Sequence, residues 1–327
     1  MKKRILSIAL IIVFAISCLA GCKKQQVGTS EDNAIVEEKV ETKSFNFGFS
    51  GMDMQNPFFV TLEQSVRGEV ETNGHTMISA DPGMDVNLQI QQISEMIAEG
   101  IDAIFLCPIS WDGIAPAIEE LKDAGVKIIN IDSEVKAIDG VDAFVGSNNK
   151  EAGKMCGKDL IESRPDGGKI ILLEAATQNS IKERLSGFES EIAGDGFEII
   201  ARADCNGEKE SAKETVAAML ADHSMITAIM CGNDPMALGA MEAVQEAGRT
   251  DILIYGVDGS PEFKQELQKE NTPLKATCGQ SPINIGMQAA EIGIKMLNGE
   301  KFDKITREKV FLINTENVYM YGVDGWQ

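Results

Sequence analysis

The chain has 327 residues, of which 30 are lysine or arginine and 51 are aspartate or glutamate, and its formal net charge is −21. This excess of negative charge argues against nucleic acid or an anionic membrane surface as a partner. The length is sufficient for two lobes, each with its own hydrophobic core.

The first residues have the pattern of an export signal. Three basic residues precede an apolar run from Ile5 to Ala20, which is shorter than the ~20 apolar residues of a membrane-spanning helix. The run ends in Leu-Ala-Gly-Cys at 19–22, which resembles a bacterial lipobox. We therefore expect a signal peptide over 1–21, lipidation of Cys22 and a polar tether over 22–43. The alternative is an ordinary signal peptide in which this cysteine occurs by chance.

After the tether, short apolar runs alternate with segments of helical periodicity. In chain order, the runs are FNFGF, TMISA, DAIFL, VKIINI, DAFVG, KIILLEA, FEIIARA, ITAIMC, DILIYGV and LKATC. The first helical segment begins at Asn56-Pro57, a capping residue followed by a proline, and continues to Gly74. Repeated strand–helix–strand units predict an α/β fold with parallel sheets and helices on both faces.

Five cysteines lie in this alternating region: Cys107, Cys156, Cys205, Cys231 and Cys278. Their number is odd, most lie in apolar runs, and no C-x-x-C pair or histidine-containing metal spacing is present. We expect them to be free and mostly buried. The sequence predicts neither a metal site nor a cofactor.

Polar or small residues follow several of the predicted strands. In open parallel sheets, ligands bind beyond the carboxyl ends of the strands, and those ends carry Ser50, Cys107, Asp132, Asn233, Asp258 and Gln280. Such residues often cap the next helix instead. After the last three, however, a separate capping residue and a proline follow, at Asp234-Pro235, Ser260-Pro261 and Ser281-Pro282. We therefore predict that Asn233, Asp258 and Gln280 are available to a ligand.

Several longer motifs carry a resemblance to a known family. They are NPFFV, NIDSEV, KERLSGF, GNDPMALGAMEAV, YGVDGSPE and GQSP. Over residues 44–314 the chain resembles the type I periplasmic sugar-binding proteins of the ribose-binding group. The resemblance implies two doubly wound parallel-sheet lobes joined by a three-strand hinge, with one sugar enclosed between them. The lobes would comprise 44–147 with 281–308, and 148–280 with 309–327, in a monomer.

The resemblance also implies a set of ligand-binding residues. Asn56, Phe58 and Phe59 match a motif that faces the cleft, where aromatic rings pack against sugar C–H groups; the alternative is that both rings belong to the lobe core. The positions that would hydrogen-bond the sugar are Asp132, Arg184, Asn233, Asp258 and Gln280. We expect Asp132 and Arg184 to lie on opposite lobes.

The sequence departs from the ribose-binding pattern at four positions. Cys107, Ser133, Cys205 and Val257 stand where that pattern has Asn, Arg, Phe and Phe. The loss of two aromatic walls and a guanidinium implies a ligand other than ribose, such as a hexose, a ketose or a polyol. Trp111 follows a strand end and is a candidate replacement wall, or it packs under its own loop.

These observations favour a lipid-anchored receptor on the outer face of a Gram-positive cytoplasmic membrane. It would capture a monosaccharide or polyol and deliver it to the permease of an ABC importer. A sensor subunit that reports the sugar to a membrane receptor would carry the same pattern. An enzyme is disfavoured: Asp132 and Asp258 could be imagined as a glycosidase pair, but the sequence has no phosphate loop, G-x-S-x-G or H-E-x-x-H motif. We therefore predict no catalytic residues.

Overall fold

The computed structural model describes residues 43–327. The predicted signal peptide, the lipidation site at Cys22 and the tether up to residue 42 lie outside the described residues. Within the described part, no helix combines the length and the apolar character that a membrane crossing requires.

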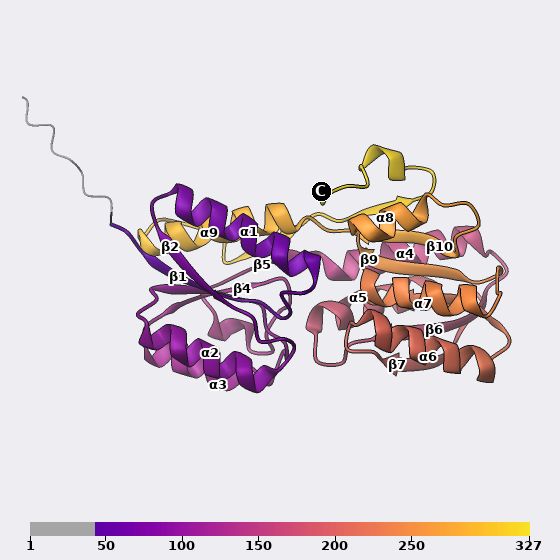
Figure 1. The fold of residues 1–327 in the computed structure, drawn as a ribbon, viewed down its shortest axis with the longest axis horizontal. Coiled ribbons are helices and arrows are strands. Elements are labelled where there is room, and N and C mark those ends of the chain that lie inside the picture. The colour runs from indigo at the N-terminus through magenta and orange to yellow at the C-terminus, as the bar shows by residue number, and fades with distance from the viewer. Residues whose placement is uncertain (1–42) are drawn as a thin grey trace, which may run out of the picture. The chain divides into compact units, whose positions relative to one another are not determined.

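The first lobe contains a six-stranded sheet in which all strand pairs are parallel (Figure 1). Across the sheet, the strands are β11 (Ile305–Glu308), β5 (Ala143–Ser147), β4 (Lys127–Ile131), β3 (Ala103–Leu106), β1 (Asn46–Ser50) and β2 (Thr76–Ala80). Its helices are α1 (Pro57–Thr72), α2 (Val86–Ala98), α3 (Ala115–Asp123) and α9 (Pro282–Leu297). α1 packs beside α9, and α2 packs beside α3. Because helices cover both faces, β3 is buried along its whole length.

The second lobe contains another six-stranded sheet. Across it, the strands are β12 (Phe311–Asn314), β10 (Leu274–Gly279), β9 (Leu253–Asp258), β8 (Ile226–Cys231), β6 (Gly168–Glu174) and β7 (Phe197–Asp204). Its helices are α4 (Asn149–Ser163), α5 (Asn179–Ile192), α6 (Lys209–Asp222), α7 (Asp234–Glu246) and α8 (Pro261–Leu267). The predicted α/β class with two doubly wound lobes is confirmed.

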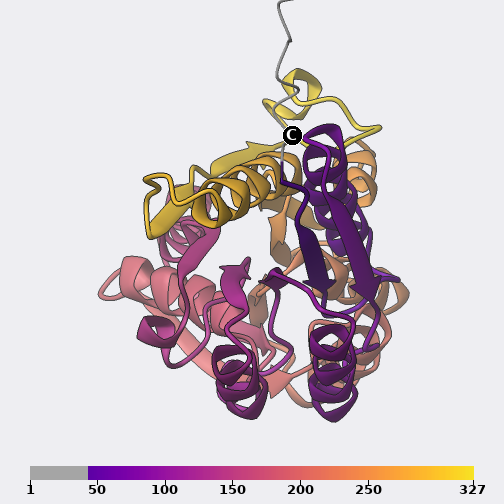
Figure 2. The ribbon, with the colours of Figure 1, turned by 90° about the vertical axis from the view of Figure 1, so that its left-hand side faces the viewer.

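The chain passes between the two sheets three times: from β5 to α4, from β10 to α9 and from β11 to β12. As a result α9 lies beside α1 in the first lobe, although β10 belongs to the second (Figure 2). The third passage also explains one departure from an all-parallel second sheet. β11 continues into β12 after only two residues, so β12 enters the second sheet from its carboxyl edge and runs antiparallel to β10.

Local sequence signals account for the ends of the elements. The side chain of Asn56 accepts a hydrogen bond from the Phe58 amide at the start of α1, and Gly74 follows the helix with φ +81°. Ser260 and Ser281 cap α8 and α9 as the sequence predicted. All five cysteines of the described region are free and buried, which confirms that prediction.

Candidate functional site

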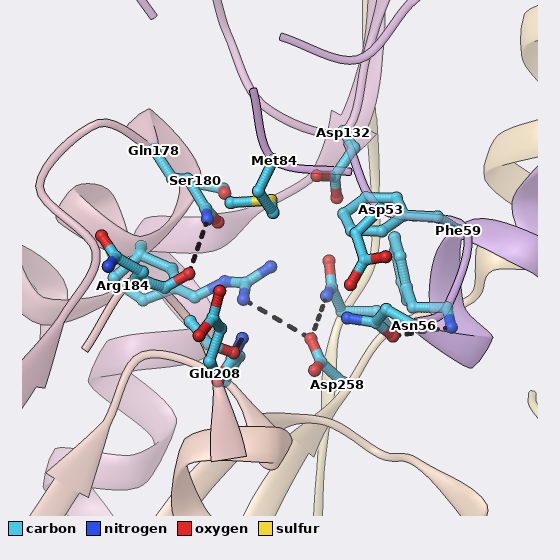
Figure 3. Close-up of a pocket in the computed structure, with 16 residues that line it drawn as sticks. Asp53, Asn56, Phe59, Met84, Asp132, Gln178, Ser180, Arg184, Glu208 and Asp258 are labelled. Carbon is cyan, nitrogen blue, oxygen red and sulfur yellow. Dashed lines mark hydrogen bonds and ion pairs between the residues drawn. The ribbon is translucent and has the colours of Figure 1, made fainter. Parts of the chain in front are cut away.

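A small cavity of about 50 Å³ lies between the lobes, beyond the carboxyl ends of both sheets (Figure 3). Both lobes supply its lining: Asp53, Asn56, Phe58, Phe59, Met84 and Asp132 from the first, and Gln178, Ser180, Ile181, Arg184, Asn206, Gly207, Glu208, Asn233, Asp258 and Gln280 from the second and its crossing. Because both lobes enclose the cavity, a molecule bound there would contact both of them.

The start of α1 supplies the aromatic part of the wall. Phe58 and Phe59 are both buried, and their rings meet edge to face with centroids 5.4 Å apart. Both rings belong to the hydrophobic core of the first lobe, and both line the cavity. The two roles that the sequence presented as alternatives are therefore combined.

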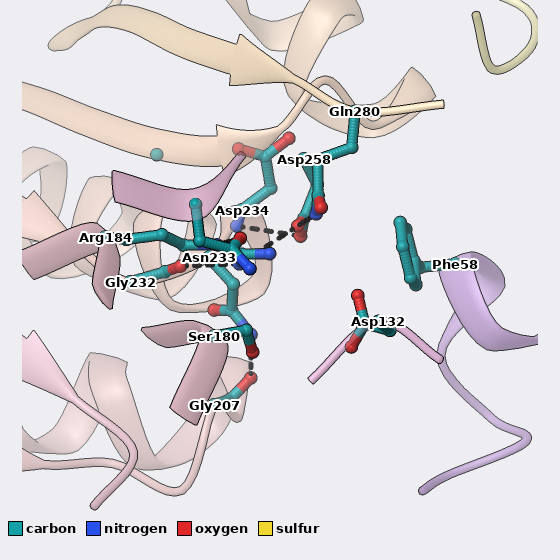
Figure 4. A network of polar contacts seen from close by, with 12 residues as sticks. Phe58, Asp132, Ser180, Arg184, Gly207, Gly232, Asn233, Asp234, Asp258 and Gln280 are labelled. Carbon is teal, nitrogen blue, oxygen red and sulfur yellow. Dashed lines mark hydrogen bonds and ion pairs between the residues drawn. The ribbon is translucent and has the colours of Figure 1, made fainter. Parts of the chain in front are cut away.

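Arg184 is the centre of the polar wall on the second lobe (Figure 4). It lies on α5 and is almost fully buried. Its Nε donates to Asn149 Oδ1 at 2.8 Å, and its Nη1 donates to the Gly232 carbonyl at 2.9 Å and lies 3.5 Å from Asp258 Oδ1. Three elements thus fix the guanidinium before any ligand arrives.

Asp258, at the end of β9, is held from three sides. Besides Arg184, it accepts a hydrogen bond from Gln280 Nε2 at 2.8 Å and one from the Asp234 amide at 3.2 Å. Burial raises its pKa to about 8, with Arg184 opposing and the nearby Asp234 reinforcing the shift. Gln280 Oε1 is buried without a hydrogen-bond partner in the described region, so an acceptor faces the site unused.

Asp132 faces this network from the first lobe. It follows β4 with φ +64°, a conformation that is strained for a residue with a side chain. Its carboxylate is buried, and Oδ2 lies 3.6 Å from the Cys107 thiol, a weak donor. Burial raises its pKa, and the charge of Arg184 opposes the shift. Asp132 and Arg184 are on opposite lobes, as the resemblance implied.

Asn233 corrects part of the strand-end argument. The sequence assigned the capping of the next helix to Asp234, whereas Asn233 itself caps α7 by accepting from the Met236 amide at 3.0 Å. Its Nδ2 donates to the Gly207 carbonyl at 2.9 Å. Asn233 still lines the cavity, but it is not a spare polar group.

Two predicted residues on the first lobe lie behind the cavity wall. The buried amide of Gln89 donates to the Ser50 hydroxyl at 3.0 Å and to the Cys107 carbonyl at 2.8 Å. Gln89 therefore links the ends of β1 and β3, and it already binds the hydroxyl of Ser50, a residue predicted to bind the ligand. Cys107 reaches the site only through its thiol contact with Asp132.

Two further predicted residues also lie outside the lining. The Ser133 hydroxyl accepts from the Ser180 amide at 3.1 Å, so it joins the lobes. Cys205 is buried in the core of the second lobe.

Trp111 does not line the cavity either. Its backbone amide donates to the Thr177 carbonyl of the other lobe at 2.9 Å, and its ring lies 3.9 Å from Lys182 Nζ. It is part of the contact between the lobes. In this geometry Trp111 does not supply a wall of the cavity, because its ring lies against Lys182.

The comparisons with known proteins agree with this architecture. The model of the periplasmic binding protein domain family matches residues 47–301. The chain belongs to this family.

Among its relatives, this periplasmic binding protein is 30% identical over 263 residues to the ribose import binding protein RbsB of Bacillus subtilis, covering 80% of this chain and 85% of that protein. It is 28% identical to the D-ribose/D-allose-binding protein of Pseudomonas aeruginosa, over 76% of this chain and 80% of that one. A solved ABC transporter solute binding protein from Mycobacterium smegmatis, with bound glycerol, matches with a TM-score of 0.82 and 28% identity, covering 86% and 98% of the two chains.

Several cavity residues of this periplasmic binding protein were missed from the sequence. Asp53, Met84, Gln178, Ser180 and Glu208 line the cavity. The last three follow β6 and β7, whose carboxyl ends were not searched for polar groups. The rule applied to the other strands would have found them.

Trp326 was also missed, because it is the penultimate residue. Its ring meets Phe58 edge to face with centroids 5.6 Å apart. The C-terminal segment is held on the second lobe, where Lys264 Nζ donates to the Gly325 carbonyl at 2.7 Å. Trp326 also lines a second, larger cavity of about 590 Å³, which shares Asn56 and Asp258 with the first.

The described residues contain no group of His, Cys, Asp or Glu side chains arranged to hold a metal ion.

The raised pKa of Asp258 predicts how stability depends on pH. Between about pH 4 and pH 8, the folded protein holds a proton that the unfolded chain has released, so the free energy of unfolding falls as pH rises. Asp258→Asn removes this term and should flatten the decline between pH 5 and pH 8. Urea unfolding of both proteins at the two pH values measures the difference; parallel declines would contradict the assignment.

Proposed function

We propose that this periplasmic binding protein captures a monosaccharide or small polyol between its lobes and delivers it to an ABC importer. The observation that carries the proposal is the cavity between the lobes, in which two aromatic rings face buried carboxylate, guanidinium and carboxamide groups. Aromatic faces pack against sugar C–H groups, and these polar groups bond hydroxyls as donors and acceptors. The names of the relatives, which refer to ribose, allose and bound glycerol, support the same class.

Capture would work by closure of the lobes. Asp132 lies on the first lobe and Arg184 on the second, so a ligand can contact both only when the lobes are closed. Hydrogen bonds to charged groups contribute roughly 1.5–3 kcal/mol each. A few of them supply the ~8 kcal/mol of a micromolar complex after ordering costs are met. No catalytic step is part of the proposal.

A thermal-shift screen of pentoses, hexoses and polyols on residues 43–327 tests this function. A ligand present at 100 times its dissociation constant should stabilise the fold by about 2.7 kcal/mol. We expect a hexose, ketose or polyol to bind more tightly than ribose, because Ser133 and Val257 replace a guanidinium and an aromatic ring of the ribose-binding pattern. A panel without any stabilising member would contradict the function.

We also propose that the mature protein acts as a monomer tethered to the outer face of the cell membrane by a lipid on Cys22. The lipobox at 19–22 and the polar stretch after it support this. Cys22→Ser should release the protein from the membrane fraction, whereas Cys18→Ser, a matched change inside the signal, should not. Membrane retention of the Cys22→Ser protein after processing would contradict lipidation.

A further inference from the structure

The wall of the small cavity carries an excess of negative charge. Its acidic members are Asp53, Asp132, Glu208 and Asp258, of which Asp258 has a pKa raised to about 8, and Arg184 is the only basic residue in the lining; three carboxylates therefore face one guanidinium near neutral pH. Within residues 43–327, only Asp258 among these acids forms an ion pair, and that pair joins it to Arg184 at 3.5 Å. Positive charge in the lining is therefore scarce.

Lys209, the residue next to Glu208, does not supply positive charge to the cavity. Lys209 follows Glu208 directly, but its Nζ lies 3.1 Å from Glu242 and 2.9 Å from Glu262, on the surface of the second lobe. Two nitrogens of Arg184 already donate to protein groups, Nε to Asn149 and Nη1 to Gly232.

Two acceptors are left facing the cavity. Asp132 is 4% exposed, and among described side chains its carboxylate forms a hydrogen bond only with the Cys107 thiol; Gln280 Oε1 is buried without a hydrogen-bond partner in the described region. A buried carboxylate without a strong donor is costly for a protein to maintain. The site therefore lacks a donor, and Asp132 forms no ion pair within residues 43–327, although the charge of Arg184 acts on it from the other lobe.

A hydroxyl group can satisfy only the first of these needs. It donates a hydrogen bond to Asp132 but leaves the charge of the carboxylate uncompensated in a buried place. An ammonium group donates up to three hydrogen bonds and also carries the compensating charge. The rings of Phe58 and Phe59 beside it would attract a cation rather than repel it.

We propose that the preferred ligand carries a primary amine on a polyhydroxylated framework, an amino sugar or an amino polyol, with its ammonium group beside Asp132. This inference rests on the proposed function, since it names the chemical class captured by the same cavity. The hydroxyls of the ligand would contact Arg184, Asn233 and Gln280 on the other lobe. Burial raises the pKa of Asp132, and the charge of Arg184 offsets only part of that shift.

Calorimetric titration of residues 43–327 at pH 6.5 with matched pairs of compounds tests the proposal. The pairs are D-glucosamine and D-glucose, D-galactosamine and D-galactose, and 2-amino-1,3-propanediol and glycerol. We expect the amine to bind at least about 10-fold more tightly than its hydroxyl partner in the pair that fits the cavity. Equal or weaker binding of the amine in every pair that binds would overturn the proposal while leaving sugar capture intact. A panel in which neither kind of compound binds would count against the proposed function too.

Substitutions separate the local charge from the charge of the whole protein. Asp132→Asn should reduce the advantage of the amine to about 3-fold or less, because the carboxamide retains the hydrogen bond but not the charge. Asp112→Asn removes an equal charge outside the cavity, where Asp112 lies 3.8 Å from Lys136, and should leave the advantage unchanged. An amine advantage that survives in Asp132→Asn would place the ammonium elsewhere and overturn the assignment.

Discussion

Replacing Arg184 by methionine is expected to weaken ligand binding by at least about 100-fold, the loss of one or two hydrogen bonds from a charged donor. Methionine fills much of the same space but cannot donate to Asn149, Gly232 or Asp258. The fold should survive, because the raised pKa of Asp258 allows its carboxyl group to remain protonated once the guanidinium is gone. Calorimetric titration with the best ligand of the screen measures the loss, and circular dichroism checks the fold.

Arg202→Met is the matched control for this change. Arg202 lies on the edge strand β7 and forms exposed ion pairs with Glu174 and Glu189. Such pairs contribute little, so its loss should change ligand affinity by less than about 2-fold. If Arg184→Met binds within about threefold of the parent, Arg184 is not part of the binding wall.

Introducing a single methyl group at Gly153 is expected to destabilise the fold by about 3 kcal/mol. Gly153 lies on α4 where it crosses α5, and a Cβ atom there would stand 1.7 Å from the Arg184 carbonyl oxygen. Because backbone cannot rotate out of the way, the two helices must separate. Gly153→Ala should therefore lower the Tm by roughly 6–12 °C, and it should also weaken ligand binding because Arg184 moves with α5.

The same glycine-to-alanine change at Gly68 is expected to stabilise the protein instead. Gly68 is exposed within α1, and no atom lies within 4 Å of the Cβ position. Alanine there should stabilise the protein by about 0.5–1 kcal/mol, since it restrains the unfolded chain and favours the helix. Thermal unfolding measures the Tm of both variants beside that of the parent protein. An unchanged Tm for Gly153→Ala would show that the close approach of α4 and α5 is not required for stability.

Most of the fold could be predicted because its signals are local. Buried strands of parallel sheets appear as continuous apolar runs, and ITAIMC coincides with the buried strand β8; TMISA coincides with the edge strand β2, which is partly exposed. β11 and β12 were not recognised as runs. β11 has the sequence ITRE with alternating exposure at a sheet edge, and its partner strand β5 lies more than a hundred residues earlier in the chain. Short edge strands depend on such distant pairing, which periodicity does not record.

The site was less predictable than the fold, because a side chain at a strand end has several possible partners. Ser50 and Cys107 were chosen for their positions, but the buried Gln89 of α2 binds both. Asn233 was thought free because Asp234 also caps well, but Asp234 instead accepts from Thr277 and Ser260 across the second lobe. Which of two neighbouring polar residues caps a helix depends on these distant groups.

The position of Trp326 has a practical consequence for anyone who builds a reporter from this protein. The ring touches Phe58 on the first lobe, while Lys264 of α8 holds the adjoining segment on the second. Indole emission from this residue should therefore change when the lobes separate, without any attached dye. A purification tag added after Gln327 would begin one residue from the contact between Trp326 and Phe58. It could disturb the contact whose emission is being measured. Tags belong at the other end of the chain, upstream of β1.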